Sequence, residues 1–341
     1  MKTEIPLYDP MTEVTGQESR VSKGAVLSFL CAWLLALTVP AAVQQPKKVP
    51  RIGFVTGNRQ ELSVTEFQRA LGNLGYIEGK NIVVEHRYTG GMTDRIVAEL
   101  VQLKPDVLVS TVPSAIRAAK QATSTIPVVF VTTGDPVAEG LVDNWARPGG
   151  NITGLTRLTR DLSGKRLELV KELLPRISRV GILWTSSSTV TTGFKAYEAP
   201  ARALKIQLQS MEVRGPNPDF ERAFRDAAKG HVSALVTVSN RMLTPYPKEI
   251  ANLAVRNRLP SMFETSYYVE FGGLMSYAAN DAEVYRRAAT YVDKILKGAK
   301  PAELPVEQPT KFEFIVNLKT AKQIGLTISP NVLARADKII R

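Results

Sequence analysis

Cysteine is almost absent from this chain, because Cys31 is the only one among its 341 residues. Cys31 lies in an apolar N-terminal run that we expect to be cleaved, so the mature chain has none. Disulfide bonds and a thiol nucleophile are thereby excluded. Stability must then come from a large apolar core, which roughly 300 mature residues are long enough to form. That length is typical of two domains.

Histidine is nearly as scarce, with His86 in a strand pattern and His231 at a helix end. Both positions favour surface or capping roles. The sequence contains no metal-ligand spacing, no G-x-S-x-G elbow and no G-x-G-x-x-G fingerprint. The run 75–81 is weakly similar to a P-loop, but Asn81 stands where Ser or Thr is needed. We therefore expect no metal, no cofactor and no enzymatic activity.

Runs of like charge are also missing, although 44 Lys and Arg against 32 Asp and Glu give a net charge of +12. The basic residues are scattered, and aromatic residues are not interleaved with them as on a nucleic-acid stacking platform. A solvated basic surface is the favoured interpretation, with no nucleic-acid partner.

The long apolar run is limited to residues 25–43, which follow Arg20 and Lys23 and end in small residues at Ala41 and Ala42. A basic flank, an apolar core and a small-residue end are typical of a cleavable signal peptide, here 1–43. The alternative is a membrane anchor, but the run before Pro40 is shorter than the roughly 20 residues that span a bilayer. The bulky residues before Cys31 argue against a lipid anchor. We expect an exported, periplasmic protein.

Beyond this leader, short β-branched strands alternate with helical segments, which indicates parallel sheets covered on both faces. In the first half we expect strands at 51–57, 82–88, 106–112 and 126–134. The run 151–158 is interpreted as a connecting segment, followed by a helix over 162–175. A second set then predicts strands at 179–185, 206–213, 234–239, 260–264 and 272–278, with a helix near 194–204. The last part predicts a helix over 283–298, a Pro-bounded link over 301–309 and a strand over 311–317.

The fold class predicted is thus α/β, with two doubly wound parallel-sheet lobes joined by a hinge of several crossings. Lobe 1 is expected to comprise 50–155 and about 279–303, and lobe 2 to comprise 156–278 and about 304–341. The binding site of such a pair is the cleft between the lobes.

Polar residues follow several predicted strands, at the carboxyl ends where open α/β sheets bind ligands. Pro113 and Ser114 open a helix whose free amides favour an anion. Any single polar residue here is more simply a helix cap, so the hypothesis depends on their convergence. Asp135 or Glu264 would suit an ammonium group, and Trp184 and Phe263 an apolar side chain, although Trp184 is equally well explained as core packing. The candidate ligand-binding residues are Thr56, Asn58, Ser110, Thr111, Pro113, Ser114, Asp135, Trp184, Ser186, Asn240, Phe263 and Glu264.

Several longer strings then show a family resemblance: EFQRALGNLGYIEGKNIVVEHRY, LKPDVLVS, IPVVFVTTGDPVAEGLV, RPGGNITGLT and LELVKELLPRISRVGILW. Together they resemble the ABC-transporter substrate-binding family with the type I periplasmic-binding fold, in the branch associated with tryptophan and tyrosine uptake. The resemblance runs from about Arg51 to the C-terminus. It implies two lobes joined by three crossings that close on a small ligand, and delivery to an inner-membrane permease powered by a cytoplasmic ATPase.

The resemblance also implies a carboxylate-binding role for the loop at Pro113 and Ser114, and it matches Asp135 to the family's Asp-Pro step, where Asp135 could instead shape the turn. The first loop, TGNRQELSVTEF, is more polar than expected for an aromatic amino acid. We expect a monomeric solute-binding protein for an amino acid or related carboxylate. A ligand-sensing receptor module for a membrane signalling protein is the alternative, and an α/β enzyme a more remote one.

Overall fold

The computed structural model describes residues 48–57, 62–90, 92–185, 191–215, 217–238, 240 and 242–341, without the side chains of 62, 63, 191 and 192. The predicted leader 1–43 and the candidate residues Asn58 and Ser186 lie outside these described residues. The chain divides into two compact units, and the second, Val49–Arg341, contains every helix and strand of the described residues.

The first part of the chain builds a sheet of five parallel strands in the order β2-β1-β3-β4-β5. Its strands are β1 (Arg51–Thr56), β2 (Val83–Tyr88), β3 (Val107–Ser110), β4 (Val128–Thr132) and β5 (Ile152–Thr156). The connecting helices are α2 (Leu62–Asn73), α3 (Thr93–Gln102) and α4 (Pro113–Ala122). The four predicted strands of this region are confirmed, with shorter ends, and helical segments lie between them as expected.

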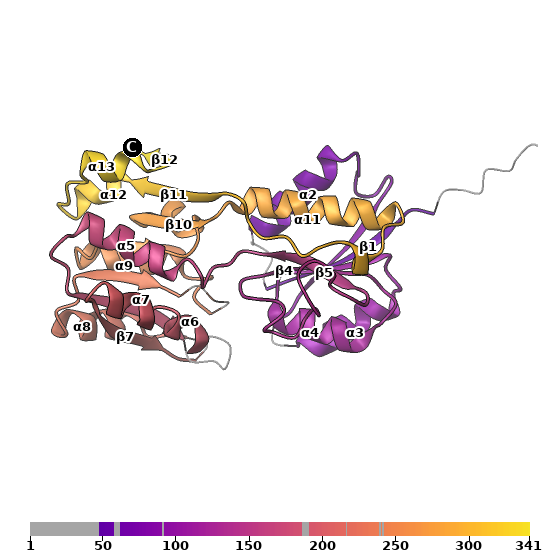
Figure 1. The fold of residues 1–341 in the computed structure, drawn as a ribbon, viewed down its shortest axis with the longest axis horizontal. Helices are drawn as coiled ribbons and strands as arrows, with labels where there is room; N and C mark the ends of the chain where they lie inside the picture. The colour runs from indigo at the N-terminus through magenta and orange to yellow at the C-terminus, as the bar shows by residue number, and fades with distance from the viewer. Residues whose placement is uncertain are drawn as a thin grey trace, which may run out of the picture. The chain divides into compact units, whose positions relative to one another are not determined.

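The two faces of this sheet follow the period of two along each strand. In β1, Ile52 and Phe54 pack with α2 and the later helix α11 (Asp281–Leu296), whereas Val55 packs with α3 and α4. Helices α2 and α11 therefore run along one side of the five-stranded sheet, and α3 and α4 along the other (Figure 1).

The second sheet has seven strands in the order β12-β11-β10-β9-β8-β6-β7. They are β6 (Arg179–Thr185), β7 (Gln207–Val213), β8 (Ala234–Thr237), β9 (Ser261–Phe263), β10 (Met275–Ala279), β11 (Phe312–Asn317) and β12 (Lys338–Ile340). All neighbours are parallel except β10 and β11, which are antiparallel. Both sheets are thus mostly parallel, as the predicted fold class requires.

Helices cover both faces of the second sheet as well. One face packs against α5 (Ser163–Leu173), α7 (Glu198–Ala203), α12 (Leu318–Gln323) and α13 (Pro330–Ala334). The other packs against α8 (Phe220–Lys229), α9 (Pro247–Arg256) and α10 (Tyr267–Glu270). The short helix α6 (Thr191–Lys195) and the 3-10 turn η1 (Pro301–Glu303) complete the elements of the described residues.

Four details differ from the sequence prediction. The segment 151–158 is not a connection, because Ile152–Thr156 forms the fully buried strand β5. The helix expected near 194–204 is two short helices, α6 and α7. Helix α10 and strand β12 were not predicted.

The chain passes three times between the part built on the five-stranded sheet and the part built on the seven-stranded sheet. It leaves after β5, returns between β10 and α11, and leaves again between η1 and β11. The segment of the third passage forms a parallel bridge from Glu307 to Leu155 beside β5. The assignment of these segments to two lobes with the boundaries given above stays a prediction.

Candidate functional site

Thr56, Ser110 and Thr132 end the neighbouring parallel strands β1, β3 and β4. Because parallel strands end at one edge of the sheet, their side chains lie along the edge where such sheets bind ligands. All three are buried. The structure therefore brings Thr56 and Ser110 to one edge, together with Thr111, whose amide donates to Val55 O at 3.2 Å.

Helix α4 begins at this edge. Its N-cap position is Val112, which cannot cap with its side chain, and Pro113 occupies the first turn. Ser110 Oγ accepts from the Val112 amide at 3.1 Å and so shapes the loop that leads into the helix. The hydroxyl of Ser114 lies 3.3 Å from Thr93 Oγ1, at the start of α3, and does not cap α4. First-turn amides and the positive end of the helix dipole favour an anion here.

Asp135, by contrast, caps a turn. Its Oδ1 accepts from the amides of Val137 at 2.8 Å and Ala138 at 3.2 Å, just after Pro136. This is the turn-shaping role that the sequence left open. The side chain is also exposed.

On the seven-stranded sheet, Trp184 in β6 is half-buried. Its Nε1 donates to Ser210 Oγ at 2.7 Å, and its ring lies 5.3 Å from that of Phe194. Asn240 follows β8 and again caps a turn, since its Oδ1 accepts from the amides of Met242 at 2.8 Å and Leu243 at 3.2 Å. Trp184 and Asn240 thus both have hydrogen-bond partners within the protein.

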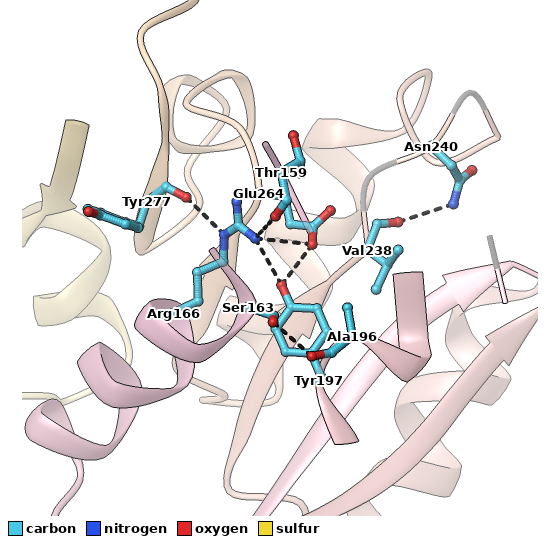
Figure 2. A network of polar contacts seen from close by, with 9 residues as sticks. All are labelled: Thr159, Ser163, Arg166, Ala196, Tyr197, Val238, Asn240, Glu264 and Tyr277. Carbon is cyan, nitrogen blue, oxygen red and sulfur yellow. Dashed lines mark hydrogen bonds and ion pairs between the residues drawn. The ribbon is translucent and has the colours of Figure 1, made fainter. Parts of the chain in front are cut away.

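Phe263 and Glu264, at the end of β9, are both buried. Phe263 is 0% exposed and stacks on Tyr268 with ring centroids 4.8 Å apart, so it packs in the core. Glu264 is 4% exposed and accepts from the Tyr197 hydroxyl at 2.7 Å. Its carboxylate also pairs with Arg166 at 3.3 Å (Figure 2). The cation that Glu264 was expected to find in a ligand is therefore already present in the protein.

Arg166 and Tyr197 contact the candidate residue Glu264 and were not predicted from the sequence. Both are completely buried, and burial raises the pKa of Tyr197 well above its ordinary value. A signal for Arg166 was present, because it interrupts the apolar face of α5 at helical spacing between Leu162 and Leu169. A charged residue on the buried stripe of a helix requires partners, which the sequence alone does not identify.

A second polar cluster ties the three passages of the chain together. Arg157, directly after β5, pairs with Asp281 at 3.0 Å and bonds the Tyr285 hydroxyl. Arg287 forms a bidentate pair with Glu307 in the third passage. The hydrogen bonds from Arg287 hold the pKa of Glu307 below its ordinary value, although Glu307 is partly buried.

The same segments line a cavity of about 360 Å³. Its walls are the end of β5, the first turns of α11 with its N-cap, and residues 307–311; the lining residues of the first two are Leu155, Thr156, Asn280, Glu283, Val284 and Arg287. No cluster of three metal-ligating side chains occurs in the described residues. Among the same residues, no helix is long and apolar enough to cross a bilayer.

Two mostly parallel sheets, polar strand ends beside a helix start and three chain passages together define the class of periplasmic-type binding proteins. The chain belongs to the ABC transporter substrate binding protein family, whose model matches residues 48–340. It is thus a substrate-binding protein of an ABC transporter, which favours transport over the alternative of a signalling receptor module.

The similar proteins agree with this assignment. A tyrosine-binding protein of Clostridioides difficile is 24% identical over 264 residues, which cover 76% of this chain and 75% of the relative. The crystal structure of a conserved domain protein from Vibrio cholerae is 25% identical in sequence, with a TM-score of 0.77. The match covers 86% of this chain and 100% of the Vibrio cholerae chain. The ABC domain from Streptococcus pneumonia, solved in complex with L-Trp, has 23% identity and a TM-score of 0.74 over 85% and 99% of the two chains. The solved structures show the shared fold.

Proposed function

We propose that this protein captures an aromatic amino acid, L-tyrosine or L-tryptophan, between the strand ends of its two sheets and passes it to an ABC permease. The observation that carries the proposal is the start of α4, where Pro113 and Ser114 stand beside Thr56 and Ser110. A carboxylate suits this helix start. The relatives named for tyrosine and L-Trp supply the ligand class.

The other half of the site is formed by the carboxyl ends of β6, β8 and β9. Trp184 is half-buried there and packs against the core on one side, and its remaining exposed surface would supply a face for the ligand's ring. Asp135, being exposed, is the remaining candidate for the ligand's ammonium group. Phe263 and Glu264 are buried, so they would not contact the ligand and would instead support the strand-end wall, the carboxyl ends of β6, β8 and β9, by core packing and by the ion pair with Arg166.

The proposed activity is binding and release alone. Ser110 Oγ bonds the Val112 amide and Ser114 Oγ lies against Thr93, so neither hydroxyl is paired with a general base. Ligand contact with both halves would shift the equilibrium between open and closed forms by its differential affinity. The closed, monomeric form would dock on an inner-membrane permease driven by a cytoplasmic ATPase, from the periplasmic side.

A thermal-shift screen of the mature protein tests the proposal. A ligand at about 100 times its Kd adds roughly 2.7 kcal/mol to the free energy of unfolding. L-Tyrosine and L-tryptophan should therefore raise the Tm by several degrees, whereas tyramine, which lacks the carboxylate, should not. An equal shift with tyramine would contradict the carboxylate role of α4. No shift with any amino acid would contradict the proposed ligand class.

A further inference from the structure

Arg166 has an unusual environment for a charged residue. It projects from α5 and is 0% exposed. Its guanidinium donates from Nε to Tyr277 O at 2.8 Å and from Nη1 to Thr159 O at 2.6 Å. The same Nη1 lies 3.2 Å from the Tyr197 hydroxyl and 3.3 Å from Glu264 Oε1 (Figure 2). One side chain thus contacts four separate segments.

These segments have different roles in the fold. Thr159 belongs to the first passage of the chain, three residues after β5. Tyr277 lies in β10, just before the second passage. Glu264 directly follows β9 at the strand-end wall of the proposed ligand site. Arg166 therefore joins two of the three passages to that wall.

The first passage is held in a defined conformation. Leu158 has φ of 49°, which is uncommon for a residue other than glycine. Its neighbours are fixed on both sides, since the amides of Arg157 and Thr159 donate to Thr132 O and Thr133 O. The amide of Thr159 thus donates to the part built on the five-stranded sheet, and the carbonyl of Thr159 accepts from Arg166. A strained residue persists where its surroundings are this well determined.

Stability alone does not account for a buried arginine at this position. Arg166 Nη2 is buried and has no hydrogen-bond partner among the described residues, which carries a desolvation cost. Buried ion pairs are often no more stabilising than apolar residues of similar volume. The guanidinium does offer donors in a rigid fork, so it fixes the directions of several acceptors at once, which a lysine cannot do.

We infer that Arg166 is a positioning residue that couples the Glu264 wall of the ligand site to the first and second chain passages. The inference rests on the proposed function insofar as the wall contacts an aromatic amino acid. Ligand contact at the wall would then be transmitted through Arg166 to the segments on which opening and closing depend. The conformation of these segments should depend on the fork even without ligand.

The test compares Arg166→Lys with the wild type and with Arg179→Lys. Arg179 is half-buried at the start of β6, where its guanidinium donates to the backbone carbonyl of Gly230, so it is a control for replacing an arginine that bonds a backbone carbonyl. We measure affinity for L-tyrosine and L-tryptophan by titration calorimetry, and amide hydrogen exchange of peptides covering 157–162 and 275–283 without ligand. Arg166→Lys should lower affinity by about 5- to 150-fold, the usual range of coupling between two sites. It should also speed exchange in both peptides, while Arg179→Lys changes neither quantity.

Each arm has a result that overturns the inference. If the wild type binds and Arg166→Lys binds equally well, with unchanged exchange in both peptides, Arg166 couples nothing. If exchange rises uniformly over the whole chain, its role is global stability alone, and the inference also fails. If the wild type binds neither amino acid, the proposed function fails, and the exchange arm still decides the coupling.

A second pair of variants guards against misfolding. The double variant Arg166→Met with Glu264→Met removes both charges at similar volume and should keep the fold. It should still show faster exchange in 157–162. Tyr197→Phe removes one hydrogen bond to Glu264 and one from Arg166 Nη1, but it keeps the ion pair and the bonds from Arg166 to Thr159 O and Tyr277 O, so it should leave that peptide unchanged. Unchanged exchange in the double variant would contradict the inference.

Discussion

Replacing Ser114 by alanine separates a ligand-binding role from a structural one. The structure shows that Ser114 Oγ bonds Thr93 Oγ1 and does not cap α4. Loss of one neutral, half-buried hydrogen bond should lower the unfolding free energy of the ligand-free protein by about 0.5–1.5 kcal/mol. A hydrogen bond from the hydroxyl to a ligand carboxylate involves a charged acceptor and contributes more, about 1.5–3 kcal/mol. Affinity should therefore fall roughly 10- to 150-fold.

Titration calorimetry with L-tyrosine and L-tryptophan, together with urea unfolding of the ligand-free protein, measures both quantities. Ser329→Ala is the matched control, because Ser329 Oγ caps α13 by accepting from the Val332 amide. That control should lose about 1 kcal/mol of stability and no affinity. If Ser114→Ala shows the same pattern as Ser329→Ala, Ser114 is not in the ligand site, and the start of α4 is not the carboxylate site.

Three further predictions concern a close approach in the five-stranded sheet, the pH dependence of stability and the N-terminus of the exported protein. Gly154→Ala should destabilise the protein by at least about 1–3 kcal/mol, because the added Cβ would lie 2.1 Å from a backbone oxygen of β4. Gly72→Ala, in an open helical position, should instead stabilise the protein by about 0.5–1 kcal/mol. Equal urea midpoints for the two variants would contradict this. Because the pKa of Glu307 is lowered, its pairing with Arg287 stabilises the fold above the ordinary carboxyl pKa, and this stabilisation is lost as the pH falls through the lowered pKa. Glu307→Gln should therefore make the free energy of unfolding depend less on pH on the acid side. An unchanged dependence on pH would refute this. Mass spectrometry of exported protein should find the N-terminus near Ala42 to Gln45, and an intact leader would contradict the predicted signal peptide.

The fold could largely be predicted because its signals are local. Apolar β-branched runs such as 128–132 lie in buried strands, and the amphipathic helices between them follow a period of 3.6. Strand β5 was missed because its sequence, ITGLT, holds two threonines and a glycine after a Pro-Gly-Gly turn. Its threonines are satisfied by distant carbonyls, such as that of Leu304, 151 residues away from Thr153. Such tertiary partners leave no local trace in the sequence.

The break between α6 and α7 has a local cause that was overlooked. Pro200 cannot donate a backbone hydrogen bond and is tolerated only in the first turn of a helix, which places a new start near Glu198. One helix over 194–204 was therefore the less favourable interpretation.

The candidate site was predicted as a set of positions, but not as a set of roles. The strand-end rule placed Thr56, Ser110 and Ser114 at one edge, because that rule follows from topology alone. It could not show that Asp135 and Asn240 cap their own turns, or that Glu264 pairs with Arg166. Roles of this kind depend on partners distant in sequence.

Small-angle scattering of the mature protein during titration with L-tyrosine and L-tryptophan tests the central claim most directly. The claim is that one small ligand closes the two halves of a substrate-binding protein. At saturation, we expect one ligand per chain and a smaller radius of gyration for the wild type. Ser114→Ala should reach the same compact form, but only at the higher ligand concentration that its weaker affinity requires. Saturable binding of neither amino acid, or binding without any change in the radius of gyration, would contradict the account.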